Sequence, residues 1–158
     1  MRVSWAGGWA RSLMGFMGVA VALAASGCAH HPSAPSTSRL EAGAAIPWVT
    51  DYETGMSQAQ ESGKPMMVEV STSWCSACKR LDEEVFSRRD VVEAAAPFVP
   101  IRVDAEKRRD LEKKFAVSGY PTIVFLTPEG KEIGRVRGAV PYQVMLGQLA
   151  DAAQKAGG

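Results

Sequence analysis

The chain has 158 residues, 46% of them hydrophobic, and its 18 basic and 17 acidic residues leave a formal net charge of +1. This length accommodates one domain with a substantial core, and the balanced charge lacks the basic excess that nucleic-acid-binding proteins carry. We therefore expect one globular domain and do not expect nucleic acid as a partner.

The first 27 residues have the layout of a secretory signal peptide. Arg2 and Arg11 supply positive charge, residues 13–25 are an uncharged run, and residues 25–27 are small, as a cleavage site requires. The run is shorter than the ~20 apolar residues that a membrane-spanning helix needs. We therefore predict that residues 1–27 are an export signal outside the folded domain.

Cys28 directly follows the residues L-A-A-S-G. This segment resembles the lipobox of bacterial lipoproteins, in which the cysteine becomes the acylated N-terminus. Ala25 stands where lipoboxes usually have leucine, and residues 25–27 also suit the ordinary signal peptidase, so simple secretion is the alternative. The resemblance implies a lipid anchor at Cys28 on the periplasmic side of the envelope, and Ala29, in place of aspartate, favours the outer membrane.

Residues 28–45 have the composition of a flexible tether, because they are rich in proline, serine and alanine and contain little that could pack. His30 and His31 are adjacent in this segment, and we interpret them as solvated rather than as metal ligands. The folded domain is predicted to extend from residue 46 to residue 158.

The first predicted elements are a short helix and a buried strand. Thr50 and Glu53 have the spacing of a capping box, residues 52, 56 and 59 share one helical face, and residues 63–65 end the helix. Residues 66–70 are an apolar run of strand length. Apolar residues at helical spacing then run from position 78 to position 85, which places Cys75 at or near a helix N-terminus.

The second half continues the alternation. Asp90 and Glu93 have capping-box spacing and predict a helix that stops at Pro97; residues 98–103 read as a strand whose proline indicates an end or a bend. Residues 105–115 are predicted to be helical, with two buried side chains, Leu111 and Phe115.

Residues 121–126 and 131–137 are predicted strands joined by a turn at residues 127–130, and Pro141 opens a final helix. That helix is expected to carry Tyr142, Val144, Met145 and Leu149. Helices between the early strands imply parallel crossovers, whereas the short turn makes the last two strands antiparallel. We therefore predict an α/β fold with a mixed central β-sheet and helices on both faces.

Cys75 and Cys78 lie in the segment S-T-S-W-C-S-A-C-K-R. Zinc sites need three or four protein ligands, but beyond this pair the chain offers only Cys28 and the tether histidines. A structural disulfide here would close a loop too short to constrain much of the unfolded chain. A Cys-x-x-Cys pair between a strand and a helix therefore favours redox chemistry, without a metal or another cofactor.

The two cysteines are not equivalent in the predicted structure. Free N–H groups at a helix N-terminus stabilise a thiolate, the attacking form of cysteine, and Cys75 lies at that position. Cys78, one turn into the helix on its apolar face, is expected to be more buried. We therefore predict that Cys75 attacks a partner disulfide and that Cys78 resolves the mixed disulfide.

Residues 74–79, W-C-S-A-C-K, and residues 119–122, G-Y-P-T, together resemble the thioredoxin superfamily. The chain is most similar to the C-terminal periplasmic domain of DsbD-type thiol-disulfide interchange reductases. Three segments carry this similarity: the K-P-M-M-V run at residues 64–68 and the segments around residues 86–87 and 103–104. The resemblance covers about residues 46–153 and implies a thioredoxin fold.

The resemblance also implies roles for individual residues. Pro121 matches the cis-proline beside the cysteine pair, with a strand-initiating trans proline as the alternative, and the backbone of Tyr120 would pair with an extended substrate. Glu69 takes the place of a buried aspartate and would be the general base for Cys78; an outward-facing strand glutamate is the alternative. Trp74 would shield the site, or else pack in the domain.

We therefore predict a lipid-tethered, monomeric thiol-disulfide oxidoreductase of the envelope that acts as a protein-disulfide reductase. Because exported proteins meet an oxidising compartment, we expect it to receive electrons from a membrane protein. Potentials in such proteins range from ~−270 to ~−120 mV, so a disulfide oxidase or isomerase of the same fold is one alternative. A non-catalytic binding or assembly lipoprotein with a thioredoxin fold is the other.

Overall fold

The computed structural model describes residues 45–158. The predictions for the export signal, for acylation of Cys28, and for the tether with His30 and His31 lie outside the described residues.

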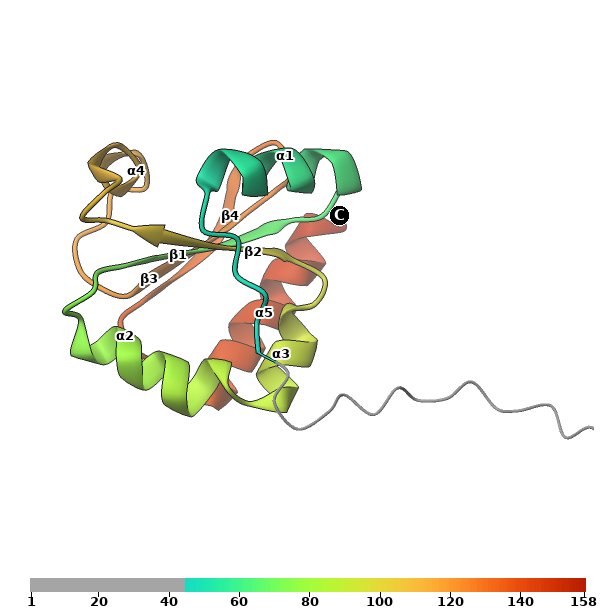
Figure 1. Ribbon diagram of the computed structural model, residues 1–158. Helices are drawn as coiled ribbons and strands as arrows, with labels where there is room; N and C mark the ends of the chain where they lie inside the picture. The colour runs from blue at the N-terminus through green and yellow to red at the C-terminus, as the bar shows by residue number, and fades with distance from the viewer. Residues whose placement is uncertain (1–44) are drawn as a thin grey trace, which may run out of the picture. The chain divides into compact units, whose positions relative to one another are not determined.

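Within the described residues, helices alternate with the strands of a single sheet (Figure 1). The elements in chain order are α1 (Tyr52–Ser62), β1 (Met66–Ser71), α2 (Ser76–Leu81), the π-helix η1 (Asp82–Phe86), α3 (Arg89–Ala95), β2 (Val99–Asp104), α4 (Arg109–Lys114), β3 (Thr122–Leu126), β4 (Glu132–Arg137) and α5 (Tyr142–Ala156). The predicted strands are all present, whereas the π-helix that continues α2 was not predicted.

The sheet has the strand order β2-β1-β3-β4 and is mixed, as predicted. Strand β2 is parallel to β1, and β3 is antiparallel to both β1 and β4. The expectation of a parallel crossover was therefore right for β1 and β2 but wrong for β3. Helix α4 has 6 residues, or about 9 Å of length, which is too short to carry the chain back along a strand of about 20 Å.

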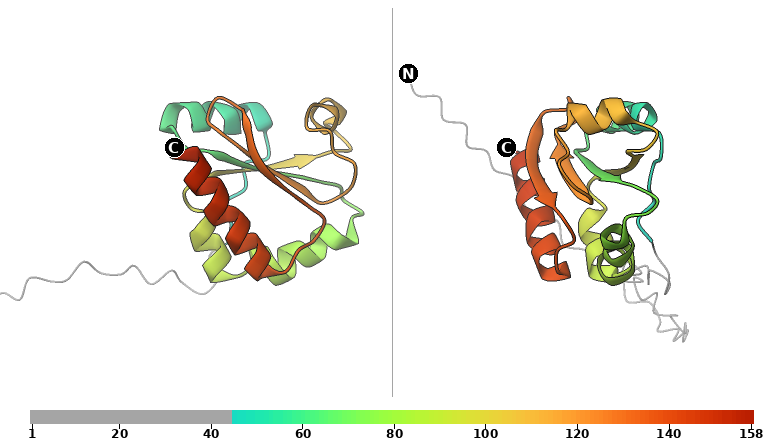
Figure 2. Two further views of the ribbon diagram at one scale, coloured as in Figure 1. Left: turned by 180° about the vertical axis from the view of Figure 1, so that it is seen from behind. Right: turned by 90° about the vertical axis from the view of Figure 1, so that its left-hand side faces the viewer.

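Helices cover both faces of the sheet, which confirms the predicted layers (Figures 1 and 2). Helices α1 and α4 lie on one face, and α2, η1, α3 and α5 lie on the other. Alternation along β1 sends Met66, Val68 and Val70 to the first face, where they join the core under α1 and α4. Met67 joins the other core, so Glu69 also belongs to the face that α2 covers.

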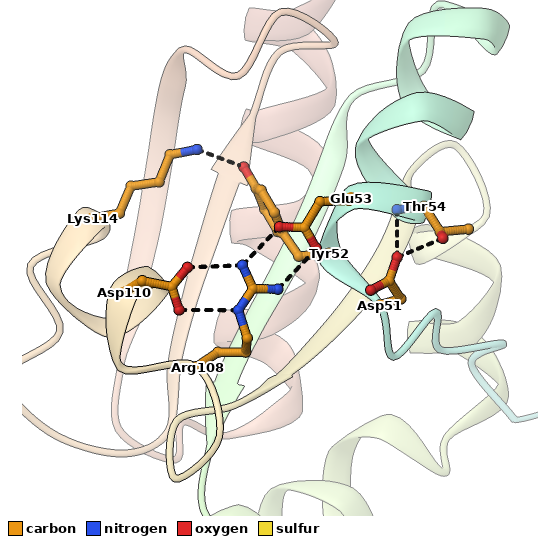
Figure 3. A network of polar contacts seen from close by, with 7 residues as sticks. All are labelled: Asp51, Tyr52, Glu53, Thr54, Arg108, Asp110 and Lys114. Carbon is orange, nitrogen blue, oxygen red and sulfur yellow. Dashed lines mark hydrogen bonds and ion pairs between the residues drawn. The ribbon is translucent and has the colours of Figure 1, made fainter.

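Helix α1 begins one residue later than the predicted capping box. Its N-cap is Asp51, whose carboxylate accepts a hydrogen bond from the N–H of Thr54 at 2.8 Å (Figure 3). Glu53 instead pairs with Arg108, and Thr50 lies outside the helix. Asp and Thr are adjacent here, and aspartate is the stronger cap.

Two further helix predictions need correction. Helix α3 has Arg88 as its N-cap without a side-chain hydrogen bond, and Asp90 pairs with Arg88 rather than forming a box with Glu93. Helix α5 carries the four expected residues, of which Met145 and Leu149 are buried and Val144 is 46% exposed. Leu111 and Phe115 are buried as predicted, although α4 is shorter than the range 105–115.

Candidate active site

Cys75 and Cys78 form a disulfide at the start of α2, with their Cα atoms 5.3 Å apart. The chain leaves β1 at Ser71 and turns through a hydrogen bond from the N–H of Cys75 to the carbonyl of Thr72. Cys75 is the N-cap of α2, and its Sγ accepts a hydrogen bond from the N–H of Cys78 at 3.1 Å. The predicted strand–turn–helix setting of the pair is therefore present.

Burial does not distinguish the two cysteines in the disulfide form. Cys75 is 6% exposed and Cys78 is 5% exposed, so the expected greater burial of Cys78 amounts to only 1% in this form. What distinguishes them is position, because the sulfur of Cys75 faces the unpaired N–H groups of the first turn. Those groups favour a thiolate on Cys75 once the disulfide is reduced.

Glu69 is fully buried on β1, so the interpretation as an outward-facing strand residue was wrong. Its Oε2 accepts a hydrogen bond from Nε of Arg102 at 2.5 Å, and its Oε1 has no partner among residues 45–158. Burial raises the pKa of Glu69 to about 7; the charge of Arg102 opposes this rise and that of Asp82 adds to it. A carboxyl group with such a pKa can take or give a proton near neutral pH.

Arg102 joins Glu69 to the helical layer. The two residues are paired in the parallel register of β1 and β2, and Nη2 of Arg102 contacts Oδ1 of Asp82 at 2.5 Å. A pocket of about 520 Å³ beside them is lined in part by Thr72, Cys78, Asp82 and Arg102. Sequence reasoning did not select Arg102 or Asp82, because their proximity to Glu69 depends on strand register.

Trp74 and Tyr120 lie together beside the disulfide-bearing turn. The ring of Trp74 is 66% exposed and meets the ring of Tyr120 edge-on, with centroids 5.8 Å apart. The alternative of a core-packing tryptophan was therefore wrong. The hydroxyl of Tyr120 donates a hydrogen bond to Glu112 of α4, and this bond raises the pKa of Tyr120 and lowers that of Glu112.

The Tyr120–Pro121 peptide bond is cis. Val70 near the end of β1 is paired with Thr122 at the start of β3, so Pro121 lies at the sheet end from which the chain runs to Cys75. The carbonyl of Pro121 accepts a hydrogen bond from the N–H of Gly138 at 2.7 Å. Within residues 45–158, the backbone N–H and carbonyl of Tyr120 form no hydrogen bond.

A second acidic residue holds the turn before the cysteines. Glu106 accepts hydrogen bonds from both the backbone N–H and the hydroxyl of Ser73, at 3.0 and 2.7 Å. These bonds lower the pKa of Glu106. Glu106 and Glu112 were not predicted as site residues, because the approach of the α4 region to this turn leaves no pattern in the sequence.

In the part of the chain that the structure describes, no cluster of three His, Cys, Asp or Glu side chains is arranged to hold a metal ion. Over the same residues, no helix is both long and apolar enough to cross a membrane.

Residues 52–153 match the family model of the thioredoxin-like domain. Because this match covers more than half of the chain, the protein belongs to the thioredoxin-like family, and the predicted α/β thioredoxin fold is confirmed. A solved thioredoxin from Thermus thermophilus superposes with a TM-score of 0.66 at 28% identity, over 72% of this chain and 92% of that protein.

Two relatives give a more specific likeness. The chloroplastic thioredoxin-like protein HCF164 of Arabidopsis thaliana is 31% identical over 110 residues, which are 70% of this chain and 42% of that protein. The thiol:disulfide interchange protein DsbD of Vibrio cholerae is 27% identical in an alignment 154 residues long that covers 90% of this chain and 26% of that protein. The chain thus spans less than half the length of these relatives. The predicted resemblance to DsbD-type proteins is confirmed.

Proposed function

We propose that the protein is a thiol-disulfide oxidoreductase that reduces protein disulfides through Cys75 and Cys78. The observation that carries this proposal is the disulfide at the N-terminus of α2, directly after a central strand of a thioredoxin fold. The kinship with proteins named for thiol:disulfide interchange supports it.

The reaction begins with the reduced pair. The thiolate of Cys75 attacks one sulfur of a partner disulfide; an S–S bond to the partner forms, and the other partner sulfur leaves as a thiolate. The thiol of Cys78 then loses its proton and attacks Sγ of Cys75, which releases the second partner thiolate and forms the Cys75–Cys78 disulfide. Two electrons and, after protonation of the products, two protons pass to the partner.

Glu69 is proposed as the general base that accepts the thiol proton of Cys78. Its carboxyl group is buried on the sheet face that α2 covers, has one unpartnered oxygen among the described residues, and has a pKa of about 7. A base with this pKa is about half ionised at neutral pH, so it can accept a proton and return it without a large energetic cost.

Trp74, Tyr120 and Pro121 are proposed to bind the substrate. The exposed ring of Trp74 offers apolar contact area, and Tyr120 keeps its ring beside Trp74. The backbone groups of Tyr120 are not used within residues 45–158, which suits hydrogen bonds to an extended segment of the partner next to its disulfide.

Trapping of mixed disulfides tests the activity. The Cys78→Ala variant should hold partners covalently on Cys75, because the resolving thiol is absent, and mass spectrometry should identify them. Cys75→Ala is the matched control and should trap far less. If Cys78→Ala forms no mixed disulfide in cells, the binding or assembly alternative replaces the proposed activity.

Equilibration with glutathione decides the direction of exchange. A reductase, supplied with electrons by a membrane protein, should have a potential near ~−270 mV, whereas a value near ~−120 mV would support an oxidase instead. We also propose that the protein acts as a monomer.

The anchor is a separate part of the proposal. We place the domain on the periplasmic side of the bacterial envelope, at the outer membrane, through acylation of Cys28. Mass spectrometry of the mature N-terminus should find a diacylglyceryl cysteine, and Cys28→Ser should release the protein from the membrane fraction. An unmodified N-terminus would mean simple secretion.

A further inference from the structure

The guanidinium group of Arg102 connects two carboxylates that belong to different elements, Glu69 of β1 and Asp82 of η1. Its Nε donates to Oε2 of Glu69 and its Nη2 donates to Oδ1 of Asp82, both at 2.5 Å. Glu69 is buried on β1, whereas Asp82 begins η1 and is partly exposed. Arg102 therefore links the strand that carries the buried acid to the helical segment that follows the cysteine pair.

Arg102 is held on more than one side. Its register partner on β1 is Glu69, and its guanidinium carbon lies 4.4 Å from the centre of the Trp48 ring. A planar guanidinium that stacks on an aromatic ring and pairs with two carboxylates has a fixed orientation. A lysine ammonium would keep the charge but could not reproduce this fork.

The contact with Arg102 leaves one oxygen of Glu69 unused. Oε2 is engaged, whereas Oε1 is buried without a hydrogen bond inside residues 45–158. Arg102 also lines the same pocket as Cys78, together with Asp82 and with Thr72, whose buried hydroxyl is likewise unpartnered among the described residues. Arg102 and Asp82 thus border a pocket that the resolving residue, Cys78, also lines.

We propose that Arg102 is a positioning residue for the resolving step: it engages Oε2 of Glu69, leaves Oε1 free to accept the thiol proton of Cys78, and connects the site to Asp82. This inference rests on the proposed oxidoreductase function and on Glu69 as its base. The chemistry is one proton transfer, from Sγ of Cys78 to Oε1 of Glu69, followed by attack of the new thiolate on Sγ of Cys75.

The charges around Glu69 predict that loss of Arg102 and loss of Asp82 shift the pKa of Glu69 in opposite directions. Arg102 of β2 favours the ionised form of Glu69, Asp82 of η1 disfavours it, and the β3 residue paired with it, Ile123, is uncharged. Loss of Arg102 therefore raises the pKa of Glu69 above about 7, and loss of Asp82 lowers it. General damage to the fold would not move the two variants in opposite directions.

The experiment measures the resolving step alone. The reduced protein reacts with 5,5′-dithiobis(2-nitrobenzoate), and stopped-flow absorbance follows the second release of thionitrobenzoate, in which Cys78 attacks the mixed disulfide on Cys75. The rate is recorded between pH 5 and 9 for the wild type and for Arg102→Gln, Arg102→Lys, Asp82→Asn and Glu69→Gln. Arg89→Gln, which breaks an exposed ion pair with Glu93 on α3, is the matched control.

For Arg102→Gln we expect the pH profile to move to higher pH. An upward shift of one unit from a pKa of about 7 lowers the ionised fraction, and hence the rate at pH 7, about fivefold. The difference should vanish at alkaline pH. Asp82→Asn should move the profile to lower pH, Arg102→Lys should recover part of the loss, and Arg89→Gln should match the wild type.

The outcomes distinguish a failure of the role of Arg102 from a failure of Glu69 as the general base. An altered profile in Glu69→Gln with an unchanged one in Arg102→Gln overturns the role of Arg102 and leaves Glu69 as the base. An unchanged profile in Glu69→Gln overturns both. If Arg102→Gln does not fold, the other two variants decide. A pH profile shifted to lower pH in Asp82→Asn, together with a partial loss of rate in Arg102→Lys, supports the proposal. Unchanged profiles in both variants reject it. Trapping with Cys78→Ala tests the oxidoreductase activity independently.

Discussion

The ring of Trp74 meets the ring of Tyr120 edge-on, and the Tyr120 hydroxyl is in turn bonded to Glu112. Trp74 is the only exposed tryptophan among residues 45–158. Through Tyr120 it is connected to Glu112 of α4, a helix on the opposite face of the sheet from α2. The edge-to-face contact with Trp74 and the hydrogen bond to Glu112 therefore both restrict the ring of Tyr120.

We predict that Tyr120→Phe weakens reduction of protein disulfides more than reduction of a small disulfide. Without its bond to Glu112, the ring of Tyr120 moves more freely and no longer orders Trp74, so KM for a protein substrate should rise about threefold, within the range of a lost surface hydrogen bond. The measurement compares insulin reduction with reduction of a small aromatic disulfide.

Glu112→Gln is the companion variant, because glutamine can still accept the Tyr120 hydrogen bond. It should retain most of the activity toward insulin. Equal losses in Tyr120→Phe for the large and the small substrate would show that Tyr120 acts on the cysteines rather than on partner binding.

A second prediction concerns Gly55 on α1. A Cβ atom there would lie 2.5 Å from both Cγ1 and Cδ1 of Ile101 on β2. Alanine normally gains about 1 kcal/mol over glycine inside a helix, but overpacking of this kind costs about 1–3 kcal/mol. We therefore expect Gly55→Ala to destabilise the protein by about 1 kcal/mol, measured by urea denaturation.

Gly147 provides the control for Gly55, since it lies within α5 and a Cβ atom there would meet nothing within 4 Å. Gly147→Ala should stabilise the protein by about 0.5–1 kcal/mol. A gain in both variants would mean that Ile101 can move away from α1 without cost.

A third prediction concerns Arg108, which pairs with Glu53 of α1 and with Asp110 of α4 (Figure 3). Its hydrogen bonds lower the pKa of Glu53 below its ordinary value of 4.5. They also lower the pKa of Asp110 from 3.8 to about 2. Depressed carboxyl pKa values contribute stability that is present above the unfolded values and is lost as the pH falls through the folded ones.

Arg108→Gln should therefore lower the free energy of unfolding at pH 7 and approach the wild type as the pH falls from 4.5 toward about 2. Denaturant titrations of both proteins at several pH values check this. Because these groups are exposed, added salt should also reduce the difference. A difference independent of pH and salt would exclude the ion pairs as its cause.

The sequence was sufficient for features that depend on neighbouring residues. Apolar runs predicted β1 and β3, the turn at residues 127–130 predicted β4, and the spacing of Cys75 and Cys78 before a helical pattern predicted the redox site. It could not predict Arg102, because the pairing of Arg102 with Glu69 depends on the register of β1 and β2, and residues 33 positions apart carry no shared local pattern.

Two other differences between the predicted and the observed structure have separate causes. Asp51 and Thr50 could each cap α1, and the helix uses aspartate, the stronger cap. The direction of β3 depends on how far α4 carries the chain, which periodicity does not report.

The last prediction concerns the stability cost of Glu69. Its pKa is raised from 4.5 in the unfolded chain to about 7 in the folded protein, so the folded state binds more protons between these values. Stability from this group is therefore fully present below pH 4.5 and is lost as the pH rises toward about 7. A shift of this size corresponds to about 3 kcal/mol in order of magnitude.

Glu69→Gln removes the ionisation while nearly preserving volume, and its amide oxygen can still accept the hydrogen bond from Arg102. Its stability should change less between pH 5 and 8 than that of the wild type, and above pH 7 it should be the more stable protein, although its mixed disulfides resolve more slowly. Denaturation of the oxidised proteins across this pH range provides the test, with Glu93→Gln on the exposed face of α3 as the control. Parallel pH curves for Glu69→Gln and the wild type would show that Glu69 titrates at an ordinary pKa and carries no such cost.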